Sequence, residues 1–171
     1  MNLTEVLLND GKVIKRQTDF APDVLDLPQG QFPIARKSPI SLTVTNKGKK
    51  VLEIEGGTSL EVLMPCDRCL KEVSTPVDIS FDFEVDMKLS DEARVKALDE
   101  SDFLHGSELD TDALIQSEAL MALPAKVLCR EECKGLCPVC GQDLNIRDCG
   151  CDRSVPDPRM AKIRDLFHSM N

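Results

Sequence analysis

The spacing of the cysteines constrains this chain more than any other feature. Eight cysteines occur in 171 residues, and six of them fall within one short segment. These six are Cys129, Cys133, Cys137, Cys140, Cys149 and Cys151. The middle pair stands in Cys137-Pro138-Val139-Cys140-Gly141, the form of a zinc knuckle, whose short turn lets both sulfurs reach one ion. A glycine suits the position after the second cysteine, where the chain turns sharply, often with a positive φ. The pattern predicts that a metal ion folds this segment.

Four of these cysteines form the predicted ligand set. Cys149 and Cys151 are two residues apart, so in an extended chain their side chains project to the same side. They are expected to close a site with Cys137 and Cys140 across a loop of eight residues. Four thiolates fill the tetrahedral coordination sphere of zinc and leave no position for a substrate. The cofactor is therefore predicted to be structural Zn²⁺.

The other two pairs of cysteines leave alternatives open. Cys129 and Cys133, one helical turn apart, are alternative ligands, and a cluster of two ions sharing six thiolates is a further alternative. Cys66-Asp67-Arg68-Cys69 lies between two predicted strands. We interpret Cys66, Arg68 and Cys69 first as a packed or functional turn, and second as half of another metal site. A redox dithiol is the least favoured alternative, because such dithiols lie where a strand runs into a helix.

The expected compartment is the cytoplasm. The first ten residues lack the basic region and the long apolar run of a signal peptide, and no later apolar stretch could span a bilayer. Cytoplasmic thiols stay reduced, which favours metal ligands and buried thiols over disulfides. The two histidines, His105 and His168, have no identifiable nucleophilic partner, and no phosphate-binding glycine loop is present. The chain is thus predicted not to be an enzyme and to have no small-molecule substrate.

The negative charge is concentrated in one stretch. Residues 82–118 hold twelve Asp and Glu against three Lys and Arg, in a chain of net charge -9. Such a stretch repels a phosphate backbone and attracts a basic partner. A solvated segment that only keeps the protein soluble is the equally favoured alternative.

The hydrophobic pattern predicts an α+β fold based on an antiparallel meander, with barrel-like closure as an option. From Val77 to Leu89 every odd residue is apolar and every even one is polar, as in a strand with one buried face. Three shorter strands are expected before it, with Gly56-Gly57 as the turn between the second and third. These strands are Ile40–Thr45, Val51–Glu55 and Leu60–Met64.

The remaining segments complete the predicted fold. Thr4–Ile14 is expected to add a strand, and the proline-rich segment Phe20–Pro39 to be an irregular connection. Helices are predicted over Asp112–Leu123 and, with an apolar stripe that docks on the sheet, from Asp157 onward. Two or three helices are therefore expected in all.

We predict two parts along the chain. Residues 1–128 are expected to form the sheet domain with the acidic stretch, and residues 129–171 the zinc-knuckle segment and a C-terminal helix, packed on the same core. If the chain binds RNA, short groups of basic residues are the expected contacts. These are Arg36, Lys37, Lys47, Lys49 and Lys50, or Lys134 and Arg147 near the knuckle.

Several ordered motifs resemble those of the bacterial YceD-like family of large ribosomal RNA subunit accumulation proteins. They are Cys66-Asp67-Arg68-Cys69-Leu70, the segment from Cys133 to Asn145, Cys149-Gly150-Cys151, and Asp157-Pro158-Arg159-Met160-Ala161. The resemblance covers most of the chain from about residue 40 onward. It implies a role in accumulation or processing of large-subunit (23S) ribosomal RNA.

The resemblance also implies the partners. Family genes commonly neighbour that of a basic large-subunit ribosomal protein, which suits the acidic stretch of this chain. The expected function is a non-enzymatic ribosome-biogenesis factor that binds large-subunit rRNA, a basic large-subunit ribosomal protein, or both. The alternative is a zinc-stabilised adaptor or regulator unrelated to ribosomes. No membrane partner is expected.

Overall fold

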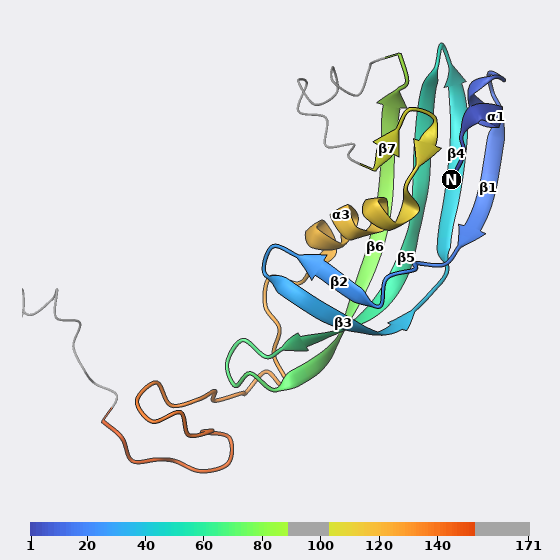
Figure 1. Ribbon diagram of the computed structural model, residues 1–171. Coiled ribbons are helices and arrows are strands. Elements are labelled where there is room, and N and C mark those ends of the chain that lie inside the picture. The colour runs from blue at the N-terminus through green and yellow to red at the C-terminus, as the bar shows by residue number, and fades with distance from the viewer. Residues whose placement is uncertain (89–102, 153–171) are drawn as a thin grey trace, which may run out of the picture. The chain divides into compact units, whose positions relative to one another are not determined.

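The computed structural model describes residues 1–88 and 103–152 (Figure 1). The chain divides into two compact units. The sheet unit comprises Met1–Pro65 and Glu72–Val127, and the cysteine-rich unit comprises Cys66–Lys71 and Leu128–Asn171. The boundary after residue 128 stays a prediction, but the structure groups the loop Cys66–Lys71 with the C-terminal segment. All eight cysteines are free thiols and belong to the cysteine-rich unit.

Six antiparallel strands build the main sheet of the sheet unit. They are β1 (Val13–Thr18), β2 (Val24–Leu27), β3 (Gly30–Lys37), β4 (Ile40–Gly48), β5 (Val51–Pro65) and β6 (Glu72–Asp86). Strand β5 is central, because it pairs with β6 over its whole length while its other edge pairs first with β4 and then with β3. Strand β1 pairs with β4, and β2 with β3. The antiparallel sheet is thus confirmed, but within the described residues it is not closed into a barrel.

Alternation of apolar and polar residues places the core on one face of this sheet. Along β6, Val77, Ile79, Phe81 and Val85 are buried, while the polar residues Asp78, Ser80, Asp82 and Glu84 between them are exposed. The ring of Phe83 is partly buried and packs against Phe81 and Phe103, with centroid distances of 6.0 and 5.3 Å. The long strand predicted from Val77 is therefore confirmed as far as Asp86; Leu89 lies outside the described residues.

The turn predicted at Gly56-Gly57 is wrong, because both glycines lie inside β5. Each allows a close approach of neighbouring strands. A Cβ atom on Gly56 would overlap the carbonyl oxygen of Ser41 in β4 and lie 2.8 Å from the ring of Phe81 in β6. A Cβ atom on Gly57 would likewise overlap the backbone carbonyl oxygen of Ile79. The two expected short strands are consequently one strand of 15 residues.

Two predictions for the N-terminal third are also wrong. Phe20–Pro39 is not irregular, since it contains β2 and β3. Pro22, Pro28 and Pro39 lie outside the strands, whereas Pro33 lies within β3, opposite Val24 of β2. Thr4–Ile14 is not a strand over most of its length. Thr4–Leu7 forms the short helix α1, and only its last two residues belong to β1.

The helix predicted over Asp112–Leu123 is confirmed as α3 (Thr111–Ala122). Asp110 caps it by accepting hydrogen bonds from the backbone N–H groups of Asp112 and Ala113, each at 3.0 Å. The helix packs against β6 and β2 (Figure 1). A small hairpin of β7 (Leu104–His105) and β8 (Glu108–Leu109) precedes it.

The described residues contain few helices beside the sheet, which fits the α+β class loosely. The helix expected from Asp157, with His168 in it, lies outside the described residues. No helix in residues 1–88 or 103–152 is long and apolar enough to cross a membrane.

Candidate metal centres

The predicted ligand set converges within the cysteine-rich unit. The sulfur atoms of Cys137, Cys140, Cys149 and Cys151, which we call the C-terminal thiol group, all lie within 4.8 Å of one another. Four sulfurs bound tetrahedrally to one zinc ion lie about 3.8 Å apart, given Zn–S distances of about 2.3 Å. The group therefore fits a closed structural site; the binding of a metal, and its identity, stay predictions.

A tight turn presents the first two of these thiols. The backbone N–H of Cys137 donates to the carbonyl of Gln142 at 2.8 Å, and the N–H of Gly141 donates to the carbonyl of Cys137 at 2.9 Å. Gly141 has a φ of 73°, as its sequence position suggested. Hydrogen bonds from the backbone N–H groups of Cys140 and Val139 lower the pKa of the Cys137 thiol to about 6. The turn thus favours the thiolate, which is the form that binds metals.

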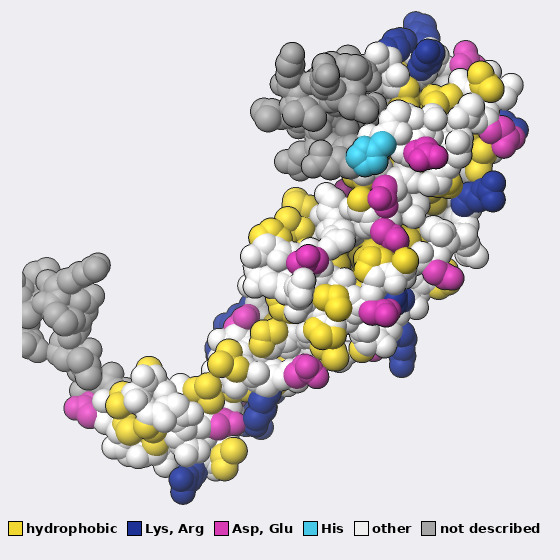
Figure 2. All heavy atoms as spheres, viewed as in Figure 1, with side chains coloured by type: hydrophobic (Ala, Val, Ile, Leu, Met, Phe, Trp, Pro, Cys, Tyr) yellow, Lys and Arg dark blue, Asp and Glu magenta, His cyan; other side chains and the backbone are white. Residues whose placement is uncertain are grey.

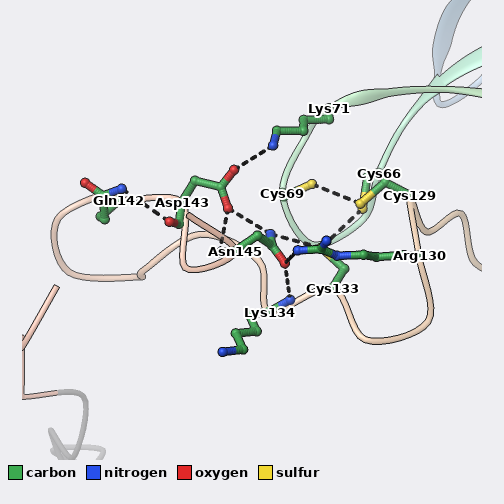
Figure 3. A network of polar contacts seen from close by, with 10 residues as sticks. All are labelled: Cys66, Cys69, Lys71, Cys129, Arg130, Cys133, Lys134, Gln142, Asp143 and Asn145. Atoms are coloured by element: carbon green, nitrogen blue, oxygen red, sulfur yellow. Dashed lines mark hydrogen bonds and ion pairs between the residues drawn. The ribbon is translucent and has the colours of Figure 1, made fainter. Parts of the chain in front are cut away.

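The other four cysteines form a second group that the sequence analysis did not assemble. The sulfur atoms of Cys66, Cys69, Cys129 and Cys133, which we call the hairpin thiol group, also lie within 4.8 Å of one another. The sulfurs of Cys66 and Cys133 are 3.9 Å apart, and those of Cys69 and Cys129 are 3.6 Å apart. Figure 3 shows these side chains converging from the loop between β5 and β6 and from the segment after Leu128.

Cys129 and Cys133 therefore group with Cys66 and Cys69, and not with the C-terminal thiol group for which they were alternative ligands. Three of the four, Cys66, Cys69 and Cys133, are buried. Burial raises the pKa of the Cys66 thiol, but hydrogen bonds from backbone N–H groups outweigh it and lower the pKa to about 6. The Cys-x-x-Cys and Cys-x-x-x-Cys spacings were visible signals, yet nothing local in the sequence connects segments 60 residues apart, as Cys69 and Cys129 are.

Asn145 holds one side of the hairpin thiol group (Figure 3). Its amide Nδ2 donates to the sulfur of Cys133 at 3.4 Å. Its Oδ1 accepts from the backbone N–H of Lys134 at 2.8 Å and from the Arg130 guanidinium at 2.9 Å. Hydrogen bonds of this kind orient metal ligands and adjust their basicity.

Asp143 in turn orients Asn145. One carboxylate oxygen accepts from both the backbone N–H and the side-chain amide of Asn145, each at 2.8 Å. The other oxygen lies 2.9 Å from the ammonium group of Lys71. These contacts, led by the hydrogen bond from Lys71 and followed by the backbone N–H of Asn145, lower the pKa of Asp143 to about 2. Asp143 is thus a fully ionised anchor at neutral pH.

Arg68, predicted to belong to a functional turn, stabilises the same region. Its guanidinium donates to the carbonyl of Cys133 at 2.7 Å and to that of Glu131 at 3.2 Å. Its own carbonyl accepts from the backbone N–H of Leu136 at 3.0 Å. A Cβ atom on Gly135 would come within 2.8 Å of that carbonyl oxygen, so a glycine permits this approach. Within the described structure, Arg68 connects the loop of Cys66 and Cys69 to the backbone that carries Cys133.

Comparison with known proteins identifies the family. A family model described as large ribosomal RNA subunit accumulation protein YceD matches residues 54–167. The chain belongs to the YceD family. The matched range includes both thiol groups. Membership of the YceD family supports a ribosome-related role in general terms.

Two curated relatives are similar to this YceD-family chain. One is the chloroplastic large ribosomal RNA subunit accumulation protein YCED homolog 1 of Arabidopsis thaliana, which is 28% identical over 86% of the chain and 52% of the relative. The chain thus spans about half the length of that relative. The other is the uncharacterized protein YlbN of Bacillus subtilis (strain 168), which is 27% identical over 87% of the chain and 86% of the relative. No solved structure gives a significant match.

Proposed function

We propose that the chain is a non-enzymatic ribosome-biogenesis factor that supports the accumulation or processing of large-subunit ribosomal RNA in the cytoplasm. The observation that carries this proposal is the match of residues 54–167 to the YceD family. In this proposal, the C-terminal thiol group binds a structural zinc ion that gives the cysteine-rich unit a fixed shape for docking. A basic large-subunit ribosomal protein is the favoured direct partner.

The basic residues of the sheet unit support a protein partner over RNA. Lys37 donates to the carbonyl of Pro22 at 2.8 Å and to the carboxylate of Asp23 at 2.7 Å. Arg36 pairs with Glu61 at 3.4 Å, and Lys47 pairs with a carboxylate oxygen of Glu53 at 2.7 Å. Three of the predicted RNA contacts are therefore paired within the protein. In Figure 2, acidic and basic side chains are interspersed over the described surface of this view, without a large basic patch.

The outer face of the sheet also supports a protein partner over RNA. Glu53 stands opposite Glu84, and Glu55 opposite Asp82, in the register of β5 and β6. Carboxylate oxygens of Glu53, Glu55 and Asp82 lie within 4.8 Å of one another. Like charges in directly opposed positions repel. Lys47 already pairs with Glu53, and a lysine- or arginine-rich partner would relieve the repulsion that remains between Glu55 and Asp82. A phosphate backbone would be repelled by the same carboxylates.

Sedimentation profiles of ribosomes test this proposal. Cells depleted of the protein are expected to contain fewer mature large subunits or to accumulate unprocessed large-subunit rRNA, and the wild-type gene should restore both. A pull-down from gently lysed cells should recover a basic large-subunit ribosomal protein. Normal subunits and normal rRNA processing after depletion would support an adaptor unrelated to ribosomes instead. Strong RNA binding with a steep salt dependence would favour rRNA as the direct partner.

A further inference from the structure

The two Cys-x-x-Cys turns of this chain have the same backbone hydrogen bonds. In each turn the N–H of the first cysteine donates to the carbonyl five residues later: Cys66 to Lys71 and Cys137 to Gln142, both at 2.8 Å. In each turn the backbone N–H of the residue four positions later donates to the carbonyl oxygen of the first cysteine: Leu70 to Cys66 and Gly141 to Cys137, both at 2.9 Å. The turn of Cys66 is therefore built like the turn of the predicted zinc knuckle.

The flanking backbone repeats as well. The residue before the first cysteine pairs with the residue six positions after that cysteine: Pro65 with Glu72, and Leu136 with Asp143. Both turns are thus tips of antiparallel hairpins, in the same register relative to their cysteines. The first tip closes β5 and β6, whereas the second closes an isolated bridge.

The two turns differ in the residue four positions after the first cysteine, which is Leu70 in the first turn and Gly141 in the second. Leu70 has a φ of 60°, a left-handed conformation that glycine adopts freely and leucine only at a cost. Leu70 is 67% exposed, so burial of its side chain does not compensate for the strained backbone. Gly141 takes the equivalent position, with a φ of 73°. The hydrogen bonds of the turn therefore hold Leu70 in a conformation that its residue type does not favour, the same conformation that Gly141 adopts in the turn of the predicted zinc knuckle.

Two more thiols complete the donor set at the first turn. Cys129 and Cys133 bring their sulfurs within 4.8 Å of those of Cys66 and Cys69. Four thiols without a histidine or carboxylate among them match zinc, because a closed tetrahedral set of four cysteines is a usual structural zinc site. The group lies outside the ligand set of the zinc ion proposed above.

We propose that Cys66, Cys69, Cys129 and Cys133 bind a second zinc ion. This ion joins the tip of the β5–β6 hairpin to the segment that begins at Leu128, and so fixes two parts of the cysteine-rich unit that are remote in sequence. Asn145 is a positioning residue for this ion, since its amide donates to the sulfur of Cys133 at 3.4 Å. Because Asn145 follows the second hairpin tip, it couples the two metal sites.

Titration of the metal-free full chain with Co²⁺ tests the proposal, because tetrahedral cobalt thiolates absorb visible light while Zn²⁺ does not. The wild-type chain is expected to bind two equivalents with this absorption, and excess Zn²⁺ should displace both. The Cys66→Ser/Cys69→Ser chain and the matched Cys137→Ser/Cys140→Ser chain should each lose one equivalent. A wild-type chain that binds only one equivalent would overturn the proposal. So would a Cys66→Ser/Cys69→Ser chain that still binds two.

Variants of Leu70 test the site without removing a ligand. Leu70→Gly should bind both equivalents at least as tightly as the wild type, because glycine adopts the positive φ without strain. Leu70→Val should weaken the binding of only one Co²⁺ ion, the one that the Cys66→Ser/Cys69→Ser chain no longer binds, because a β-branched residue tolerates this φ poorly. Equal affinities of all three chains for both equivalents would contradict the proposed knuckle. These variants keep all eight thiols, so they decide the question even if the cysteine variants do not fold.

Discussion

The ammonium group of Lys71 lies 2.9 Å from a carboxylate oxygen of Asp143 and connects the tips of the two cysteine hairpins. The two partners are unequal: the side chain of Lys71 is 57% exposed, whereas that of Asp143 is 13% exposed. Asp143 also accepts both hydrogen bonds from Asn145. The carboxylate, more than the ion pair, is therefore expected to hold the hairpins in place.

Removing the carboxylate should accordingly matter more than removing the ammonium group. Asp143→Ala is expected to speed the release of metal to a chromogenic chelator more than Lys71→Met does, because it frees Asn145 as well as Lys71. Lys12→Met is a matched control, since Lys12 forms a 2.7 Å ion pair with Glu5 in the sheet unit. It should leave the release rate unchanged. A faster release from Lys71→Met than from Asp143→Ala would reverse this ranking.

Chelation of the metal should unfold the cysteine-rich unit without unfolding the sheet. Structural zinc contributes about 10–16 kcal/mol to the folding of small thiolate sites at neutral pH. The sheet unit has its own core, with Leu52, Ile54 and Val62 fully buried in β5. Hydrogen exchange should therefore accelerate in residues 128–152 after chelation and stay slow in β5. Unchanged exchange throughout the chain would show that metal does not hold this unit together.

Gly56 should not tolerate a side chain. Gly56→Ala is expected to destabilise the fold by about 3 kcal/mol, because its Cβ would overlap the backbone of β4 and the ring of Phe81. Glu55→Ala is a control on the preceding residue of the same strand, exposed on the outer face; it removes the repulsion with Asp82 and should change stability by less than about 1 kcal/mol. Denaturant unfolding measures both. Similar stabilities of the two variants would argue against the close approach of the strands.

Removing the N-cap of α3 should destabilise the fold less than adding a side chain at Gly56. Asp110→Ala should cost about 1 kcal/mol, because two backbone N–H groups lose their acceptor. Asp110→Ser keeps an acceptor in the same position and should restore most of that loss. Thermal unfolding of the three chains compares them directly. A full loss with serine would mean that the charge of Asp110, and not its capping geometry, stabilises the helix.

The parts of the fold that could be predicted depend on local periodicity. The alternation along β6 and the composition of α3 are local signals, so both elements were predicted correctly. Gly56-Gly57 misled the prediction because a glycine that permits close packing looks in sequence like a glycine that permits a turn. The prolines of Phe20–Pro39 misled it similarly, since whether a strand tolerates a proline, as β3 tolerates Pro33, depends on strand pairing.

The prediction of the two thiol groups was likewise limited to cysteines that are close in sequence. Cys137, Cys140, Cys149 and Cys151 are close in sequence, and their spacing was enough to predict that they converge. The hairpin thiol group was not predicted, because Cys66 and Cys69 meet Cys129 and Cys133 only after β5 and β6 have paired. The strained φ of Leu70, which supports the second metal site, has no signal in the sequence.

Zinc content and zinc X-ray absorption of the natively purified full chain test the account most directly. The account predicts two zinc ions per chain, each bound by four sulfur atoms at about 2.3 Å. One zinc ion per chain or fewer, or oxygen and nitrogen ligands in place of sulfur, would contradict it.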